Sequence, residues 1–188
     1  MTRKILTITT ALAFVPAIAF AQANTATVDQ TGDRHEATVS QTGTRINADV
    51  TQSSQDNTAT VTQSNSSDFS VDAQVEQTGS GNDATVTQTH NGNQAGGLEA
   101  VVTQSGDDNS ALQVQGPHGQ QGRTYAEILQ VGSGNTAEQY QLKYGNDAFI
   151  EQLGNGNTAR QAQDLRLPPE AEGSVNYARI AQSGDGNR

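Results

Sequence analysis

The sequence is poor in the residues that usually build and cross-link a folded core. Its 188 residues include no Cys, no Trp, one Met, four Pro, four Phe and four Tyr. The absence of Cys excludes a disulfide scaffold and a zinc–cysteine site. Leu, Ile, Val and Phe number only 33, a share below the ~20% at which composition alone favours disorder. A conventional layered core is not expected, because too little apolar surface is available to offset chain entropy.

Positive charge is also scarce. Ten Lys and Arg face 20 Asp and Glu, so the formal net charge is −10. Direct nucleic-acid binding is not expected, because it requires clustered basic residues. In place of apolar and basic residues, the sequence is rich in Gln (22), Thr (22), Gly (19) and Asn (14). Two interpretations remain, namely a disordered polar chain or a repeat that stacks identical polar side chains.

The first residues have the pattern of an export signal. Arg3 and Lys4 precede an apolar stretch, 5–20, which is too short and too interrupted by Thr for a membrane anchor. The small-x-small pattern of 19–21 predicts cleavage between Ala21 and Gln22, with a second choice after Ala23. We therefore expect residues 1–21 to be a signal peptide and 22–188 to form one repeat domain.

A unit of the form Ala-x-Val/Ile-x-Gln recurs along the rest of the chain. Taken in pairs, the thirteen units show six gaps of 11 residues, while the gaps between pairs vary from 11 to 19. One connection thus keeps a fixed length and the other can grow, which a chain without a fold would not maintain. The final Gln of the units are Gln30, Gln41, Gln52, Gln63, Gln77, Gln88, Gln104, Gln115, Gln130, Gln141, Gln152, Gln163 and Gln182.

The fixed connections have the composition of tight turns. Gly stands two residues after Gln in five of six, and Asn stands five after Gln in five of six; Ser54 and His35 are the exceptions. Gly and Asn accept positive φ, which tight turns require. The predicted turn glycines are Gly32, Gly79, Gly106, Gly132 and Gly154, and the asparagines are Asn57, Asn82, Asn109, Asn135 and Asn157.

The segments between these turns alternate small or apolar residues with polar ones, a period of two that predicts strands. Ala59, Val61 and Gln63 would then share an inward face. Two short strands and a turn form an arch of about 22 residues, which buries its inner face only when arches stack. Stacking in register would let each buried amide bond the one above and below. The sequence therefore predicts an all-β solenoid of six and a half two-strand arches.

Longer connections are expected at the opposite, variable end of the arches. The predicted insertions are 64–70, 91–97, 116–124 and 164–174. The third contains Gly-Pro-His-Gly and the fourth contains Pro168-Pro169, and we expect neither within a central strand because Pro cannot donate to the ladder.

The spacing Gln-x4-Asn-x5-Gln, as in Gln77, Asn82 and Gln88, resembles the repeat of the curlin family of bacterial curli fibres. The resemblance covers nearly all of 24–187, and His35 departs from it. It implies an exported subunit of an extracellular amyloid fibre with cross-β stacking, used in adhesion and biofilm. It also implies self-assembly, a second curlin subunit as nucleator, and an outer-membrane export pore.

Catalytic and cofactor signals are weak. No Gly-x-Ser-x-Gly motif occurs, and His35, His90 and His118 stand singly and are interpreted as solvated turn residues. We therefore expect no enzyme, metal or cofactor. The alternative function is a monomeric secreted solenoid that binds ice or glycan through an outward Thr face. Its candidate residues are Thr25, Thr27, Thr58, Thr60, Thr62, Thr85 and Thr87.

Overall fold

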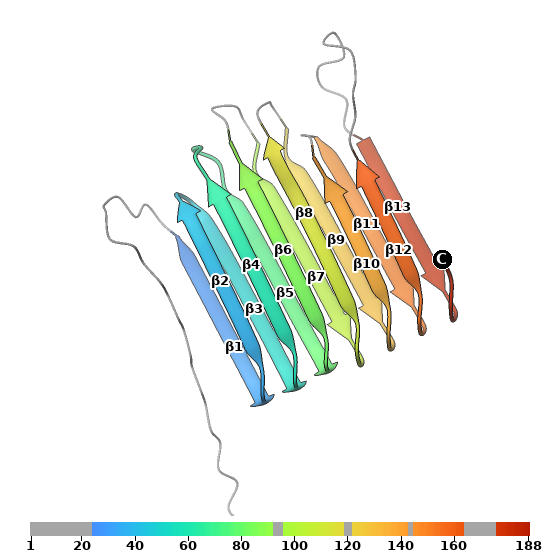
Figure 1. Ribbon diagram of the computed structural model, residues 1–188. Coiled ribbons are helices and arrows are strands. Elements are labelled where there is room, and N and C mark those ends of the chain that lie inside the picture. The colour runs from blue at the N-terminus through green and yellow to red at the C-terminus, as the bar shows by residue number, and fades with distance from the viewer. Residues whose placement is uncertain (1–23, 92–95, 119–121, 143–144, 164–175) are drawn as a thin grey trace, which may run out of the picture.

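The computed structural model describes residues 24–91, 96–118, 122–142, 145–163 and 176–188. All regular structure in these ranges is β-strand (Figure 1). The same ranges contain no helix that is long and apolar enough to span a membrane. The predicted signal peptide and its cleavage site at Ala21 and Gln22 lie outside the described residues. The strands are β1 (Thr25–Asp33), β2 (Glu36–Gly43), β3 (Ile46–Gln55), β4 (Thr58–Asn65), β5 (Val71–Ser80), β6 (Asp83–His90), β7 (Leu98–Ser105), β8 (Ser110–His118), β9 (Thr124–Val131), β10 (Thr136–Gln141), β11 (Asn146–Leu153), β12 (Thr158–Gln163) and β13 (Asn176–Ser183).

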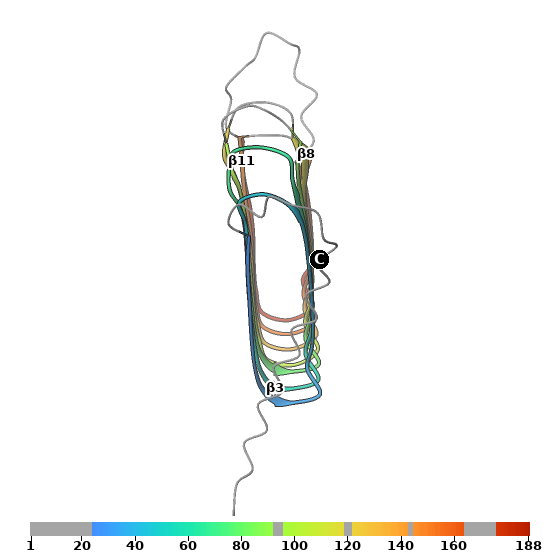
Figure 2. The ribbon, with the colours of Figure 1, turned by 90° about the vertical axis from the view of Figure 1, so that its left-hand side faces the viewer.

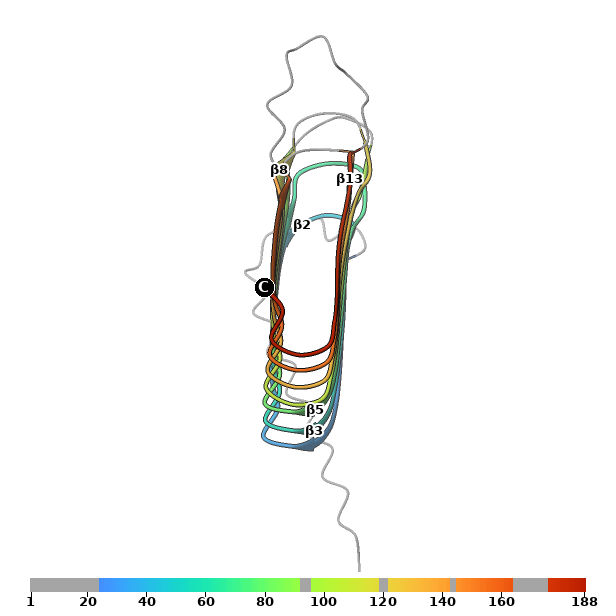
Figure 3. The same cartoon turned by 90° about the vertical axis from the view of Figure 1, so that its right-hand side faces the viewer.

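The strands form two parallel sheets that face each other. Odd-numbered strands make a seven-stranded sheet in the order β1-β3-β5-β7-β9-β11-β13, and even-numbered strands make a six-stranded sheet from β2 to β12. Consecutive strands lie in opposite sheets, so each pair is an arch and successive arches stack (Figures 2 and 3). The predicted all-β solenoid fold is confirmed.

The register of the stack places equivalent residues of the repeat on one another. Ala48, Val50 and Gln52 of β3 pair with the Ala, Val and Gln of β1 and of β5. The same alignment runs through the six-stranded sheet, where Gln63 pairs with Gln41 and Gln88. A shift by one residue would turn every inward side chain outward. The common period of the strands therefore keeps one register across insertions of different length.

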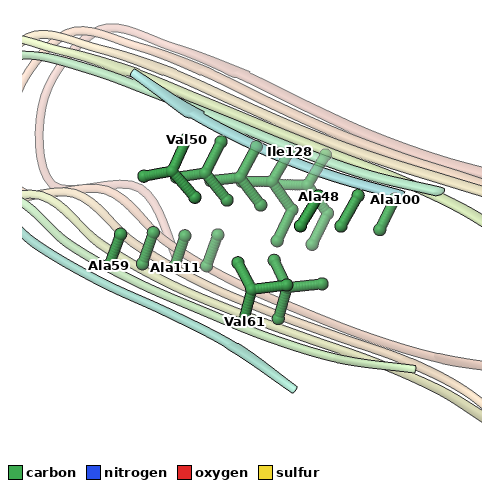
Figure 4. Packing of buried hydrophobic residues seen from close by; sticks show 14 of the residues in the cluster. Ala48, Val50, Ala59, Val61, Ala100, Ala111 and Ile128 are labelled. Atoms are coloured by element: carbon green, nitrogen blue, oxygen red, sulfur yellow. The ribbon is translucent and has the colours of Figure 1, made fainter. Parts of the chain in front are cut away.

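Small side chains fill the space between the sheets. Inward columns of Ala and of Val or Ile alternate along the strands of the seven-stranded sheet and along β2, β4 and β6, and Val50, Val61 and Ile128 are fully buried (Figure 4). Each inward Val or Ile contributes about 1.5–3 kcal/mol when fully buried. The outward neighbours on the same strands are polar in the N-terminal arches, as period-two alternation requires.

The core becomes more polar toward the C-terminus. In the six-stranded sheet, the column of Val39, Val61 and Val86 continues as Gln. In the seven-stranded sheet, the column of Ile46, Val71 and Leu98 continues as Thr and Asn. Amide side chains therefore replace aliphatic ones at Gln113, Gln139, Gln161 and Asn146.

The six connections of fixed length lie at one end of the solenoid and the variable connections at the other (Figure 1). One expectation about the variable end was wrong. β8 continues through Gly116 and Pro117 to His118, although it is a central strand. The register shifts by one residue between Gln88 and His90, so β8 carries one extra residue there. This bulge accommodates Pro117, because a bulged residue is left out of the regular ladder.

Candidate functional site: amide ladders and strand edges

A continuous ladder of Gln side chains runs the length of the seven-stranded sheet. The Nε2 of each Gln donates to the Oε1 of the Gln in the next odd-numbered strand. The second N–H of Gln104 donates to the carbonyl of Asp83 in the opposite sheet, at 3.0 Å, so the ladder also links the two sheets. The donor–acceptor distances are 2.7 Å for Gln30–Gln52 and Gln52–Gln77, 2.8 Å for Gln77–Gln104 and Gln152–Gln182, and 2.9 Å for Gln104–Gln130 and Gln130–Gln152.

A second Gln ladder follows the six-stranded sheet in the same direction. Its amides also bridge the sheets, as when Gln88 Nε2 donates to the carbonyl of Asp72 at 2.9 Å. The interior members are fully buried, and pairing is required there because an unpaired buried amide costs about 1–3 kcal/mol. The rungs are Gln41–Gln63 at 3.1 Å, Gln63–Gln88 at 2.8 Å, Gln88–Gln115 at 2.7 Å, Gln115–Gln141 at 3.0 Å and Gln141–Gln163 at 3.2 Å.

Both Gln ladders have a direction. Every Nε2 points toward the C-terminal arch and every Oε1 toward the N-terminal arch. In the seven-stranded sheet the ladder begins with the amide oxygen of Gln30, and at the other end the Nε2 of Gln182 donates to the carbonyl of Thr158. The two ends of the Gln ladders are therefore chemically different: the N-terminal end offers acceptors and the C-terminal end offers donors.

The Asn side chains form a third ladder in the fixed turns. The Oδ1 of Asn57 accepts from the backbone N and the Nδ2 of Asn82, at 3.0 and 3.1 Å. The Nδ2 of Asn82 also donates to the carbonyl of Gly106 at 2.8 Å. Each turn is thereby joined to the next by side-chain amides. The ladder contains the five predicted members, Asn57, Asn82, Asn109, Asn135 and Asn157, and continues to Asn187.

His35 occupies the first position of the Asn ladder. Its Nδ1 accepts from the backbone N of Asn57 at 3.3 Å, the role that the Asn Oδ1 plays elsewhere. Its Nε2 lies 3.2 Å from the carbonyl oxygen of Thr31 and acts as the donor to it. The imidazole therefore reproduces two contacts of a ladder Asn, the acceptor for the next turn and the bond to the carbonyl four residues earlier, which explains why the first arch keeps the turn without Asn.

Replacing His35 tests this equivalence. We expect His35→Asn to leave the free energy of unfolding within about 0.5 kcal/mol, because Asn restores both bonds. His35→Ala should lower it by about 1 kcal/mol, because the backbone N–H of Asn57 loses its acceptor. Urea unfolding followed by circular dichroism measures both. Equal losses in the two variants would show that the ring acts by packing instead.

The five predicted turn glycines all have φ between 110° and 128°. A Cβ on any of them would lie 1.9–2.2 Å from a backbone carbonyl oxygen of the next arch. A Cβ placed on Gly132 would lie 2.1 Å from the carbonyl oxygen of Gly154. Conformation and space both require glycine here. The predicted set is Gly32, Gly79, Gly106, Gly132 and Gly154, and Gly184 has the same sign of φ.

A third Gln column was missed by sequence reasoning. Gln113 Nε2 donates to Gln139 Oε1 at 2.9 Å, and Gln139 Nε2 donates to Gln161 Oε1 at 3.1 Å. The signal was present, because each residue stands two before a ladder Gln and so must share its inward face. Gln113 Oε1 and Gln161 Nε2, the two ends of this short ladder, are buried without a hydrogen-bond partner.

The prediction that the histidines are solvated turn residues was wrong for His90. This residue belongs to β6 and is 3% exposed, and its Nδ1 has no hydrogen-bond partner. His118 lies in β8 and pairs with His90 in register. Within the described ranges, no three His, Asp or Glu side chains gather as a metal-binding group.

The outward Thr residues do not form a single surface. Thr25 and Thr27 belong to β1 of the seven-stranded sheet, whereas the others belong to β4 and β6 of the six-stranded sheet. Thr60 and Thr62 pair with Thr85 and Thr87. In the next strand, β8, these positions become Leu112 and Val114.

The outer face of the C-terminal arches is aromatic and partly charged. Phe149 lies between Tyr125 and Tyr177, with ring centroids 5.4 and 5.3 Å apart. The pKa of Tyr125 is raised above its usual value, first because its side chain is partly buried and second because its hydroxyl donates to Glu127.

In the first two arches, a hydrogen-bonded ion pair with Arg34 lowers the pKa of Asp56. These charged groups are exposed, so their pairing is weak and salt-sensitive.

The similarity of this chain to known proteins lies in its first arches. The chain has no significant match among curated proteins or among solved structures. Residues 21–53, which include β1 and most of β3, match the family model of the curlin associated repeat. The Gln and Gly positions of that segment are those that recur in later arches. The chain therefore carries the curlin associated repeat, which confirms the resemblance to the curlin-repeat family.

Proposed function

We propose that this protein is a structural subunit of extracellular curli-type amyloid fibres. Subunits would add end to end, each new chain pairing its edge strands with the exposed edge of the last. The observation that carries this proposal is the direction of the Gln ladders, with acceptors such as Gln30 Oε1 at one end and a ladder donor, Gln182 Nε2, at the other. Unlike ends favour head-to-tail contacts, which generate open filaments.

The backbone supports the same mode of growth. Within the described residues, β1 and β13 are the outer strands of one sheet, and β2 and β12 are those of the other. An edge strand presents a row of unpaired N–H and C=O groups that another chain can pair with. The columns of Ala, Val and Gln would select the in-register arrangement, because a slip of one residue exchanges the two faces.

The family match supports the biological setting. A curlin-repeat subunit is expected outside the cell, in an adhesive biofilm fibre, after export by a signal peptide and passage through an outer-membrane pore. A second curlin subunit is the expected nucleator. The role is structural: we propose no catalytic activity and no cofactor. The inward Gln and Asn ladders serve as the register-setting site, and residues 22–188 act as one assembling domain.

Seeded growth tests this proposal. We expect the exported chain, denatured and diluted into buffer, to grow fibres faster when preformed fibres are added. Diffraction from the product should show reflections near ~4.8 Å and ~10 Å. Salt should speed growth, because it screens the repulsion between chains that are more negative than the −10 of the full sequence, since Arg3 and Lys4 leave with residues 1–21. A strand-rich monomer that shows no seeded growth would contradict the proposal and favour the Thr-face alternative, to be tested with ice and glycans.

Ladder variants provide a sharper test of the mechanism. The double variant Gln152→Ala, Gln163→Ala removes one Gln from each Gln ladder near the C-terminal edge, so seeded elongation should slow by about tenfold or more. Thr158→Ala changes an exposed side chain in the same arch and should leave elongation within about twofold. Thioflavin fluorescence measures both rates. Equal elongation rates would exclude the ladders from the growth step.

A further inference from the structure

The turn between β11 and β12 contains an Asn-Gly pair, Asn155 and Gly156, and both residues are exposed. The sequence has this pair at one other place, 91–92, of which Gly92 lies outside the described residues. In the five preceding fixed turns, the position of Asn155 holds Asp, Gln or Ser. The pair is chemically labile in an unfolded chain, because glycine has no side chain to keep its backbone nitrogen away from the Asn side-chain carbonyl.

The reaction of such a pair requires only water. The backbone nitrogen of Gly156 attacks Cγ of Asn155, and a new N–C bond forms as this nitrogen loses its proton. The bond from Cγ to Nδ2 then breaks and ammonia leaves, which gives a cyclic imide. Water opens the imide at either of its carbonyl carbons, so the product is Asp or isoaspartate. The net reaction consumes one water, releases one ammonia and replaces a neutral amide with a carboxylate.

Stacking of the arches holds both reacting groups in place. The backbone N of Gly156 donates to the carbonyl oxygen of Ser133 at 2.9 Å, so the attacking nitrogen is already engaged. The Oδ1 of Asn155 accepts from the backbone N of Ser133 at 2.9 Å, and its Nδ2 donates to the Oδ1 of Asp185 at 3.1 Å. The turns on both sides thus fix the side-chain amide. Attack on Cγ therefore requires the turn to separate from its neighbours first.

The product of the reaction does not fit the same stack. The Oδ1 of Asp185 accepts from the backbone N of Asn155 at 2.8 Å as well as from its Nδ2. After deamidation an oxygen replaces that Nδ2, so a hydrogen bond becomes a contact between two carboxylates. A carboxylate at this position is compatible with a neutral neighbour. Asp107 accepts from the backbone N of Ser80 at 3.0 Å, and the following turn has Ser133 there.

We propose that Asn155 is a site of spontaneous deamidation, fast in the unstacked chain and suppressed by the stacked arches, and that the modified chain assembles poorly. The first part follows from the bonds that hold Asn155 and Gly156. The second part rests on the proposed function and follows from the carboxylate that would oppose Asp185. The pair therefore limits the time for which an unstacked chain remains able to join a fibre.

Mass spectrometry of the unmodified protein tests the first part. The exported chain is incubated in its folded state and in guanidinium chloride at the same pH and temperature, and deamidation is quantified at Asn155 and at Asn157. In guanidinium, Asn155 should react about tenfold or more faster than Asn157, because the branched side chain of Thr158 obstructs ring closure. Folding should slow Asn155 by about tenfold or more, because hydrogen bonds between turns must break first. Equal rates in either comparison would overturn the inference.

Two variants test the second part. Asn155→Asp introduces the carboxylate of the product, and the double variant Asn155→Asp, Asp185→Asn exchanges the amide and the acid between the two turns. Asn155→Asp should slow seeded elongation by about fivefold or more, the effect of two like charges a few ångströms apart. The double variant should recover the rate to within about twofold, because each carboxylate again faces an amide.

Unmodified chain measured alongside the variants separates this inference from fibre assembly. Equal elongation rates for all three chains, or a double variant that remains slow, would contradict only the poor assembly of modified chains. Absence of growth in the unmodified chain would contradict fibre assembly. Urea unfolding then tests the same contact, with a lower midpoint expected for Asn155→Asp and recovery in the double variant. An unchanged midpoint for Asn155→Asp would overturn the clash with Asp185.

Discussion

Gly132→Ala is expected to lower the free energy of unfolding by more than about 4 kcal/mol, whereas Gly134→Ala should cost about 1–2 kcal/mol. The two glycines stand two residues apart in the same turn, and both have positive φ, 116° and 66°. They differ in the space around them. A Cβ on Gly132 would lie 2.1 Å from the carbonyl oxygen of Gly154, while the nearest atom to one on Gly134 is 4.0 Å away.

The clash at Gly132 is with backbone, which has no rotamer to move. The turn would have to separate from the next arch, breaking the bonds by which Asn135 and Gly154 join the two turns. Urea unfolding of both variants measures the difference, and Gly134→Ala controls for the conformational cost alone. Similar losses would mean that backbone conformation, and not the close approach of arches, makes glycine necessary at this position.

Gln104→Ala is expected to destabilise the protein by about 3–5 kcal/mol. Its Nε2 donates to Gln130 Oε1 and to the carbonyl of Asp83, and its Oε1 accepts from Gln77. Alanine leaves the Gln130 oxygen without its ladder donor and removes an acceptor from Gln77, at about 1–3 kcal/mol for each buried group left unpaired. Loss of side-chain volume at a fully buried site adds a cavity term.

Gln74→Ala is the matched control. Gln74 is an exposed residue on the outer face of β5, so the same substitution removes the same atoms without breaking a ladder. We expect it to change the free energy of unfolding by about 0.5 kcal/mol or less. The comparison isolates the buried amide from strand propensity. A loss below about 1 kcal/mol for Gln104→Ala would mean that water or backbone movement replaces its three bonds.

The spacing of the repeat was sufficient to predict the strands and the sides they bury. Period-two alternation places Ala59, Val61 and Gln63 on one face, and the structure buries all three. The constant 11-residue gap separated fixed turns from variable ones. The scarcity of large apolar residues pointed to stacked amides, because identical polar groups in register can satisfy one another whereas a conventional core cannot be built from them.

The exceptions to the repeat were harder to interpret. Gln113, Gln139 and Gln161 looked like departures from an apolar position, yet stacked on one another they form a ladder. His35 looked like a lost Asn, yet its two nitrogens make two of the contacts that a ladder Asn makes. Pro117 lies within a central strand because a bulge removes it from the pairing. In each case the outcome depends on what the neighbouring arch offers, which local sequence does not contain.

Sequence by itself determined the fold class, the repeat and the inward residues, because these follow from side-chain alternation and turn chemistry within one arch. Tertiary structure decided the direction of the amide ladders, the backbone contacts that make Gly132 indispensable, and the third Gln column of Gln113, Gln139 and Gln161. The physical reason is that the hydrogen bonds of the Gln ladders join residues at least 22 positions apart, so donors and acceptors become defined only when the arches stack.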